Sequence, residues 1–256
     1  MLKEDRYDQI YAILRERSSA TVQYLQKRLY VSEATIRRDL EAMEKGGLIE
    51  RVWGGAVLRT AEKDIPSFVR LRANAGKKER IASVASRLLK NSATIFFDSS
   101  TSCLPLVPYL AKRKDITVIT SSLKMSQMLG SRSSAIVNLL GGQVYEGYIL
   151  TGHTAVESVR NYHANQMFFS CSGLGRDGCV WSIEPRVVEI NREMMKRADQ
   201  KILLCDSSKF GKTQIWQLAD IKDIDYVISD AVPEDSALVD ALGDKLITSA
   251  DQLPKT

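Results

Sequence analysis

The sequence is poor in the residues that bind metals and form disulfides. It has four cysteines with no CxxC pair, and two histidines with neither HxH nor HExxH spacing. Disulfide scaffolds, zinc ribbons and metal catalysis are therefore unexpected, and we expect neither a cofactor nor a metal. The sparse cysteine also fits a reducing compartment, so we expect the chain to act in the cytoplasm.

The sequence also lacks a long apolar run and a strong charge of either sign. No stretch approaches the roughly 18 apolar residues that cross a membrane, and the charged start Lys3-Glu4-Asp5-Arg6 is unlike a signal peptide. We therefore expect no membrane partner. The net charge of +5 is too small to identify a nucleic-acid binder, so the local arrangement of charges has to decide.

The sequence pattern changes near residue 60 of 256. Residues 1–59 predict short helices and a hairpin, and residues 60–76, which contain Pro66, predict a linker. Residues 77–256 alternate β-branched runs with helical stretches, which predicts an α/β domain with a mostly parallel sheet covered on both faces. The strand candidates are 94–97, 116–120, 136–140, 167–170, 201–205 and 226–229, and the helix candidates are 77–89, 122–129, 154–161, 187–198 and 235–242.

The helix predicted from Glu33 to Lys45 is amphipathic. At 100° per residue its apolar side chains form one buried stripe, made of Ile36, Leu40 and Met43. Ala34 and Arg38 then point outward, and Thr35 and Arg37 flank them. A DNA major groove is suited to such a thin helix face with forked donors for guanine or phosphate.

The segments around this helix extend the DNA-binding pattern. Ser32 can cap the helix, and the hairpin carries Arg51 and Arg59, which suits a wing on the DNA backbone. The alternative is that Arg37 and Arg38 are ordinary solvated charges near Asp39 and Glu41. We expect DNA contacts from Ser32, Glu33, Ala34, Thr35, Arg37, Arg38, Arg51, Trp53, Gly54 and Gly55.

Polar loops follow five of the predicted strands, at the edge where α/β sheets bind ligands. Hydroxyls and backbone N–H groups there can hold a phosphate, carboxylates can accept from sugar hydroxyls, and a lysine supplies a positive charge. The alternative is that each loop only caps the next helix. The candidate ligand residues are Asp98, Ser99, Ser100, Thr101, Ser102, Thr120, Ser121, Gly141, Gly142, Gly173, Gly175, Asp177, Asp206, Ser207 and Lys209.

Two further patterns have more than one interpretation. Gly173–Gly178 matches GxGxxG, but no helix follows at once and Pro185 marks the next helix start, so we interpret it as a glycine-rich ligand loop rather than a nicotinamide site. Glu189, Arg192 and Lys196 share one helix face, which is either a solvated salt-bridge stripe or a border of the ligand pocket.

Several runs resemble the DeoR family of bacterial transcription regulators. Arg6, Ile10 and Leu14, followed by the run Ser32-Glu33-Ala34-Thr35-Ile36-Arg37-Arg38-Asp39-Leu40, resemble its winged helix. Between Lys77 and Asp230, the Phe97–Ser102, Leu139–Gly142, Gly173–Gly178 and Asp206–Gly211 runs, with Glu189, resemble its effector domain. The resemblance implies that the helix from Glu33 reads operator DNA. It also implies that the larger domain has a fold of the ribose-5-phosphate isomerase and CoA-transferase type, senses a sugar phosphate and places Glu189 beside the ligand. Ser100 stands where the family usually has glycine.

These observations favour one function over two others. We expect a repressor of a carbohydrate-utilisation operon whose operator affinity a sugar phosphate modulates. Operator symmetry implies a homo-oligomer, either a dimer or a tetramer. The alternative is a sugar-phosphate isomerase-like enzyme with an accessory DNA-binding head, in which Asp98, Glu189, Asp206 and Lys209 supply acid–base chemistry. A third possibility is a sensor that acts only through protein partners, but it would leave the Arg37–Arg38 face unused.

Overall fold

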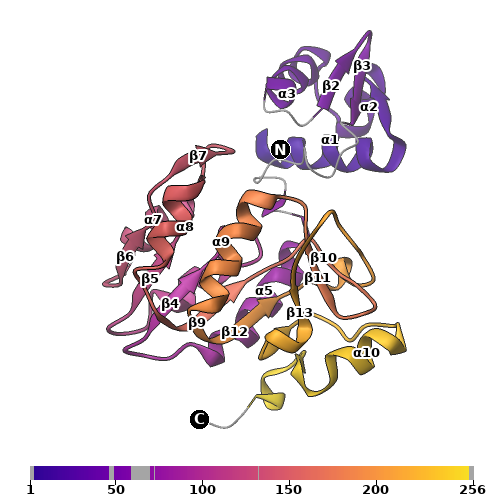
Figure 1. Cartoon of the computed structure of the whole chain (residues 1–256). Helices are drawn as coiled ribbons and strands as arrows, with labels where there is room; N and C mark the ends of the chain where they lie inside the picture. The colour runs from indigo at the N-terminus through magenta and orange to yellow at the C-terminus, as the bar shows by residue number, and fades with distance from the viewer. Residues whose placement is uncertain (1–2, 46–48, 59–69, 72, 132, 254–256) are drawn as a thin grey trace. The chain divides into compact units, whose positions relative to one another are not determined.

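The computed structural model describes residues 3–45, 49–58, 70–71, 73–131 and 133–253. The chain divides into two compact units, residues 1–73 and 74–256 (Figure 1). Most of the predicted linker, residues 60–69 and 72, lies outside the described residues, as does Arg59. The segment 74–76 belongs to the second unit, whose first helix, α5, begins at Ala75 rather than Lys77.

The first unit contains the predicted helices and hairpin together with a strand that was not predicted. Thr21 is the N-cap of the second helix, as its Oγ1 accepts from the Tyr24 N–H at 3.1 Å. The short strand before that helix completes a three-stranded antiparallel sheet of order β1-β3-β2. The elements are α1 (Lys3–Arg17), β1 (Ser19–Thr21), α2 (Val22–Leu29), α3 (Glu33–Lys45), β2 (Ile49–Val52) and β3 (Gly55–Leu58).

This unit has its own apolar core. The helical spacing of its apolar residues brings one face of each helix inward, and all three helices contribute fully buried side chains. Burying each such side chain stabilises the fold by about 1.5–3 kcal/mol. The most buried are Ile10, Leu14, Leu25, Ile36, Leu40 and Met43.

The second unit is built on a seven-stranded parallel sheet, as the alternating pattern predicts. The strand order is β15-β14-β12-β9-β4-β5-β6, and each strand runs parallel to its neighbours. All six predicted strands are present, and only the two-residue edge strand β15 was missed. The strands are β4 (Thr94–Phe97), β5 (Thr117–Thr120), β6 (Ile136–Leu139), β9 (Ala164–Phe169), β12 (Ala198–Leu204), β14 (Tyr226–Ile228) and β15 (Leu246–Ile247).

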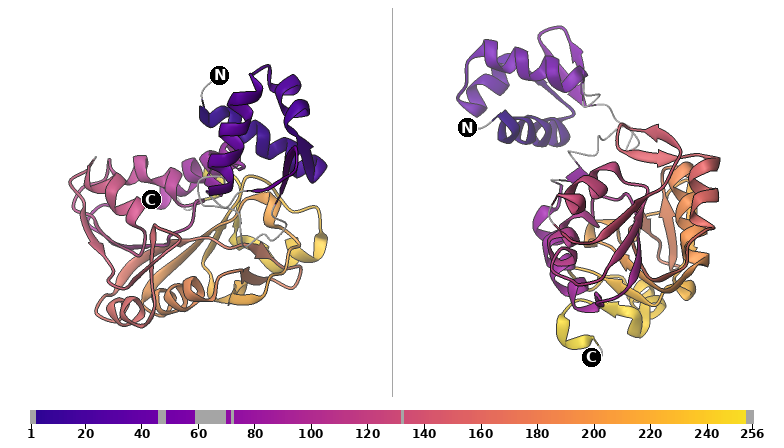
Figure 2. Two further views of the ribbon diagram at one scale, coloured as in Figure 1. Left: turned by 90° about the horizontal axis from the view of Figure 1, so that it is seen from above. Right: turned by 90° about the vertical axis from the view of Figure 1, so that its left-hand side faces the viewer.

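Helices cover both faces of this sheet (Figure 2). One face carries α8 and α9, which pack against each other, and the opposite face carries α5, which contacts β12 and β14. The β-branched and aromatic strand residues are therefore buried on both sides, Phe96, Phe97, Phe168 and Phe169 completely. The helices are α5 (Ala75–Ala85), α6 (Val107–Leu110), α7 (Leu123–Gly130), α8 (His153–Val159), α9 (Pro185–Lys196) and α10 (Ser236–Leu242).

Two smaller antiparallel elements were not predicted. One is the hairpin of β7 (Gln143–Tyr145) and β8 (Ile149–Thr151), and the other is a sheet of order β10-β11-β13. Its strands are β10 (Gly173–Leu174), β11 (Cys179–Ser182) and β13 (Trp216–Asp220). The GxGxxG segment therefore forms β10 and the turn into β11, not a loop that opens a helix.

The order of the strands decides which loops meet. β4, β9 and β12 are neighbours and run parallel, so their carboxyl ends lie at one edge of the sheet. The segments that begin at Asp98, Ser170 and Asp206 therefore come together, although they are far apart in the sequence.

Candidate functional site

The exposed face of α3 is arranged as the sequence predicts. Ser32 caps the helix, since its Oγ accepts from the Thr35 N–H at 3.2 Å and shares a 2.8 Å hydrogen bond with the Thr35 hydroxyl. Glu33, Ala34, Arg37 and Arg38 are exposed. The first turn of the helix thus presents small and polar groups to solvent beside a capped N-terminus.

The two arginines of this face differ in their partners. Arg37 donates to the Glu33 carboxylate from Nε at 3.0 Å, an exposed i,i+4 pair worth about 0.3–0.5 kcal/mol. Arg38 forms no hydrogen bond or ion pair with any described residue. Its guanidinium is therefore the more available of the two for a base edge or a phosphate.

The residue after these arginines points inward. Asp39 is only 2% exposed and accepts two hydrogen bonds from Arg6 of α1, at 2.7 Å from Nε and 3.1 Å from the terminal nitrogen. This hydrogen bond is also the main reason why the pKa of Arg6 is raised. The Asp39 carboxylate therefore fastens α3 to α1.

The hairpin of β2 and β3 carries a narrow tip. Trp53 is fully exposed there, and Gly54 has a φ of +80°, the left-handed conformation that favours glycine. Arg51 is exposed on β2. Gly55 is not at the tip. It is buried where β3 pairs with β1, and a Cβ there would collide with the Ala20 carbonyl oxygen.

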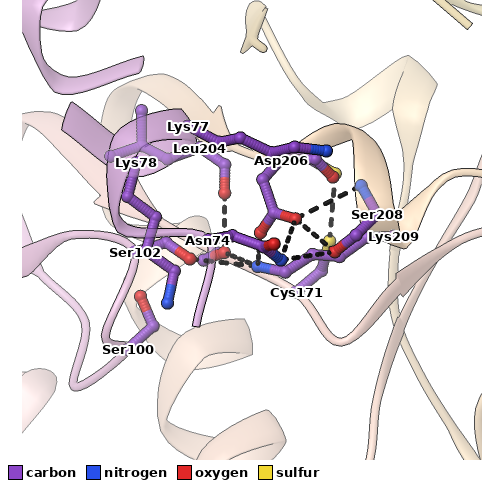
Figure 3. A network of polar contacts seen from close by, with 12 residues as sticks. Asn74, Lys77, Lys78, Ser100, Ser102, Cys171, Leu204, Asp206, Ser208 and Lys209 are labelled. Atoms are coloured by element: carbon purple, nitrogen blue, oxygen red, sulfur yellow. Dashed lines mark hydrogen bonds and ion pairs between the residues drawn. The ribbon is translucent and has the colours of Figure 1, made fainter. Parts of the chain in front are cut away.

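In the larger unit, Lys209 is the centre of a polar network at the carboxyl ends of β4, β9 and β12 (Figure 3). Its ammonium donates to Ser102 Oγ at 3.0 Å and Ser170 Oγ at 2.9 Å, and lies 3.4 Å from the Asp206 carboxylate. The structure thus brings the Asp98–Ser102 and Asp206–Lys209 segments together, as predicted.

Three residues that the sequence analysis missed complete this network. Lys78 of α5 donates to Thr101 Oγ1 at 3.2 Å, and Lys77 donates to Ser207 Oγ at 2.7 Å. Asn74 precedes α5 in the left-handed conformation (φ 58°), and its amide donates to Asp206 at 3.2 Å and Ser208 at 2.9 Å. The double lysine was the only available signal, and it looked like the solvated start of a helix.

The charges in the network stabilise one another. Burial lowers the pKa of the Lys209 ammonium, but the neighbouring Cys171 and Asp206 raise it by more, so the pKa is raised overall. Burial likewise raises the pKa of Asp206, but Lys209 and the Ser208 hydroxyl outweigh it and lower the pKa. Both groups are thus held in their charged forms at neutral pH.

Asp98 has several hydrogen-bond partners within the protein. It is 1% exposed, and its oxygens accept from the Ser100 N–H at 2.9 Å, the Ser170 N–H at 3.0 Å and the Asn191 amide at 3.5 Å. Asn191, on α9, was not predicted. Because both carboxylate oxygens are occupied, Asp98 fixes the ends of β4 and β9 relative to each other.

The loop after β4 keeps open donors beside the lysines. The backbone N–H groups of Thr101 and Ser102 form no hydrogen bond with described residues. The Ser100 hydroxyl donates to the Cys103 sulfur at 3.1 Å, and Ser99 is buried. Backbone N–H groups without a partner, on a loop that Lys78 and Lys209 contact, are suited to binding an anion.

The other predicted ligand residues have visible structural roles. Thr120 is buried and its Oγ1 accepts from Ser122 N–H, while the Ser121 carbonyl accepts from Leu150 N–H. Gly142 (φ +134°) leads towards the hairpin of β7 and β8, after the exposed Gly141, and a Cβ on it would collide with the Thr151 carbonyl. The side-chain partners of Lys209 are Ser102, Ser170 and Asp206, so these residues are not among them.

The glycine-rich segment and Glu189 lie in other local surroundings. A Cβ on Gly173 would collide with the Lys212 carbonyl, and Gly175 faces Asp177 and Trp181 across the turn into β11. The Asp177 carboxylate accepts from Cys179 N–H, the bond that lowers its pKa most. Glu189 is exposed on α9. Ligand roles for these four residues stay predictions.

The arrangement of charged groups favours binding over metal chemistry. Within the described residues, no three His, Cys, Asp or Glu side chains are grouped so that they could hold a metal ion. No helix among these residues is long and apolar enough to cross a membrane. What the network offers is two ammoniums, hydroxyls and free N–H groups directed at one small region, which suits a polyanionic group.

The fold and these two surfaces define a DNA-binding transcription regulator with a separate sensor domain. The family models agree. Residues 6–62 match the DeoR-like helix-turn-helix domain, and residues 73–231 match the DeoR C-terminal sensor domain. The chain therefore belongs to the DeoR family, and the predicted resemblance is confirmed.

Characterised relatives are similar over nearly the whole chain. The HTH-type transcriptional repressor GlcR of Bacillus subtilis is 30% identical, with 98% of this chain and 99% of the relative covered. The L-fucose operon activator of Haemophilus influenzae is 34% identical, with 84% and 87% covered. The glycerol-3-phosphate regulon repressor of Escherichia coli is 25% identical, with 93% and 95% covered. Among solved structures, ribose 5-phosphate isomerase A of Methanocaldococcus jannaschii aligns with a TM-score of 0.40, at 14% identity over 54% of this chain and 55% of that one.

Proposed function

We propose that the chain is a cytoplasmic repressor of a carbohydrate-utilisation operon, and that it senses a phosphorylated sugar at the Lys78–Lys209 niche. The observation that carries the proposal is the pair of ammoniums beside the Thr101 and Ser102 hydroxyls and free N–H groups. The names of the relatives, which include repressors and the activator of a fucose operon, support control of carbohydrate genes.

The niche favours a phosphate ester over a neutral sugar. A phosphate gains charge-assisted hydrogen bonds from Lys78 and Lys209, each worth roughly 1.5–3 kcal/mol. Two such bonds separate the ester from the free sugar by more than about a hundredfold in affinity, because about 1.4 kcal/mol corresponds to a factor of ten.

The network also supports a regulator rather than an isomerase. A general base needs a free carboxylate oxygen within reach of the proton that it removes. Both oxygens of Asp98 accept hydrogen bonds from the protein, and Asp206 is paired with Lys209, Asn74 and Ser208. The carboxylates of the network thus hold loops and lysines in place.

Calorimetry with matched pairs of sugars and sugar phosphates tests the effector class. We expect Lys209→Gln and Lys78→Gln to weaken binding of the phosphate ester at least tenfold while leaving the free sugar unaffected. Lys212→Gln, an exposed lysine three residues beyond Lys209, is the control and should change nothing. Equal affinity for a sugar and its phosphate in the wild type would contradict the proposal.

A mobility-shift titration on the promoter next to the gene tests the DNA-binding surface. Arg38→Ala should weaken operator binding by about 1–3 kcal/mol if Arg38 contacts a base. If Arg38 contacts a phosphate, the change should mainly reduce the salt dependence. Lys112→Ala removes the same charge from an exposed site of the sensor unit and should not alter binding. Wild-type affinity for Arg38→Ala at every salt concentration would exclude this face of α3.

We further propose that the repressor works as a homo-oligomer. The support is physical: a helix-turn-helix protein matches a palindromic operator with its own two-fold symmetry. Sedimentation of the chain with one and two operator half-sites tests this directly. Binding of a single chain to a full palindromic operator would contradict it.

A further inference from the structure

Two cysteine thiols meet inside the sensor network. Cys171 and Cys205 follow the neighbouring parallel strands β9 and β12, and the register that pairs Phe169 with Leu203 places them opposite each other. Their sulfurs lie 3.7 Å apart. Cys205 is fully buried, whereas Cys171 is 8% exposed, so a small molecule reaches Cys171 first.

The surroundings favour a reactive thiolate at Cys171. The hydrogen bond with Cys205 lowers the pKa of the Cys171 thiol; burial opposes this, and the positive charge of Lys209 adds to the lowering. The same contact raises the pKa of Cys205 well above its ordinary value. Thiolates, not thiols, are the nucleophiles, and we assign the attack to Cys171, the more exposed of the pair, and the resolving step to Cys205.

The remaining cysteines lack this combination. Cys103 is completely buried, and burial raises the pKa of its thiol, which accepts a hydrogen bond from Ser100. Cys179 on β11 is half-buried, and burial followed by the neighbouring Asp177 raises its pKa. The side chain that contacts the Cys103 sulfur is Ser100, and the one that contacts the Cys179 sulfur is Gln217. Each of these cysteines is therefore a control for a thiol that lacks a cysteine partner.

We propose that Cys171 and Cys205 form a peroxide-oxidisable pair that closes a reversible disulfide inside the sensor site. The Cys171 thiolate attacks one oxygen of hydrogen peroxide, an S–O bond forms, the O–O bond breaks, and the departing hydroxide takes up a proton to become water. The Cys205 sulfur then attacks the sulfenic sulfur, the S–S bond forms, and the second hydroxide leaves with the Cys205 proton. Two thiols and one peroxide thus give one disulfide and two waters.

The geometry allows this reaction with a small movement. A disulfide requires an S–S distance of about 2.05 Å and Cα atoms about 4.4–6.8 Å apart, and adjacent strands lie about 4.8 Å apart. Cys171 lies two residues beyond the end of β9 and Cys205 one residue beyond the end of β12, so a disulfide between them needs no change within the paired part of these two strands.

The disulfide would act on the effector network. It draws together the segments that carry Ser170 and Asp206, the partners of Lys209, and so displaces the ammonium from its position in the network. Oxidation should therefore weaken effector binding, an effect that rests on the proposed sugar-phosphate function. The oxidation itself does not depend on that function.

The test uses the full chain treated with graded hydrogen peroxide, followed by alkylation, digestion and mass spectrometry. We expect a peptide cross-link between Cys171 and Cys205 that dithiothreitol reverses. In Cys205→Ser we expect a sulfenic acid at Cys171 that dimedone traps, and in Cys171→Ser an unmodified Cys205. Cys179→Ser should behave as the wild type. No cross-link at peroxide levels that oxidise Cys179, or oxidation of Cys205 in Cys171→Ser, would overturn the proposal.

Calorimetry separates the two hypotheses. Reduced protein should bind a sugar phosphate at least tenfold more tightly than oxidised protein, and Cys205→Ala should bind alike before and after treatment with peroxide and dithiothreitol. If the reduced chain binds no sugar phosphate, the proposed effector class fails, while the cross-link still decides the thiol chemistry. A cross-link that leaves effector affinity unchanged would overturn its regulatory effect.

Discussion

At the scale of single residues, α3 contains two ion pairs of opposite character. Arg37 and Glu33 are both exposed, whereas Asp39 is buried and receives two hydrogen bonds from Arg6 of α1. The first pair exchanges contacts with water easily. The second joins residues 33 positions apart and so fastens α3 to α1.

Removal of Asp39 should therefore be costly. Asp39→Ala removes the carboxylate that accepts two hydrogen bonds from Arg6, and should lower the free energy of unfolding of the first unit by about 1.5–3 kcal/mol. Glu33→Ala, in the same helix, should cost about 0.5 kcal/mol or less. Hydrogen exchange of α1 and α3 measures both, since it localises the loss to this unit. Equal protection in the two variants would show that the Arg6–Asp39 pair contributes no stability.

Tyr30 occupies a backbone conformation that suits glycine. It ends α2 with φ 55° and ψ 40°, and its side chain is 93% exposed. Tyr30→Gly removes the steric cost of the left-handed conformation and should stabilise the first unit by about 1 kcal/mol. Lys27→Gly, an exposed position within α2, should instead destabilise it by about 0.5–1 kcal/mol. Urea denaturation followed by circular dichroism measures both, and a less stable Tyr30→Gly would show that the tyrosine forms a stabilising contact.

The residues that the sequence predicts well are those whose surroundings are local. The cap Ser32 and the stripe of Ile36, Leu40 and Met43 depend only on helical geometry, and both are confirmed. The burial of Asp39 depends on Arg6, and the roles of Asn74 and Lys78 depend on loops far along the chain. Local periodicity contains no signal of contacts between residues that are so far apart in the sequence.

At the scale of elements, the predicted strands are those with a local sequence signal, and the missed strands are those whose position depends on distant partners. The strands of the parallel sheet are continuous apolar runs, because helices bury both of their faces. β1, β7 and β10 have at most three residues each, and β7 is largely exposed, so no apolar run marks them. Their positions are set by partners such as β3, which no pattern within the strand reveals.

The hairpin of β2 and β3 depends on pairing with such a strand, β1. Gly55 of β3 lies against the Ala20 carbonyl of β1, where a Cβ has no room. Gly55→Ala should therefore push β1 and β3 apart and destabilise the first unit by about 2 kcal/mol, as other overpacked sites do. Gly54→Asn is the matched control, since asparagine tolerates a positive φ and open space surrounds Gly54. Thermal unfolding compares the two variants, and an equal melting temperature for Gly55→Ala and wild type would refute the close approach of β1.

At the scale of the whole molecule, the sensor network includes the residue at which the second unit begins. Asn74 donates to Asp206 and Ser208, and Lys77 donates to Ser207. The first residues of the second unit are therefore hydrogen-bonded to the loop that follows β12. If the chain senses a phosphate as proposed above, a phosphate held by Lys78 and Lys209 would compete for the charges that orient Asp206. Effector binding would then act on the start of α5, where the second unit begins.

This arrangement predicts a measurable coupling between DNA and effector. Linkage requires that the factor by which the effector changes operator affinity equals the factor by which the operator changes effector affinity, typically 5- to 150-fold. Asn74→Ala should bring this factor close to one while changing either single affinity much less, because Asn74 touches the loop that follows β12 and not the phosphate niche. Asn161→Ala, an exposed site after α8, should keep the full coupling. Calorimetry of effector binding with and without operator, beside mobility shifts with and without effector, gives both factors. An undiminished factor in Asn74→Ala would mean that the signal leaves the sensor by a route other than the start of α5.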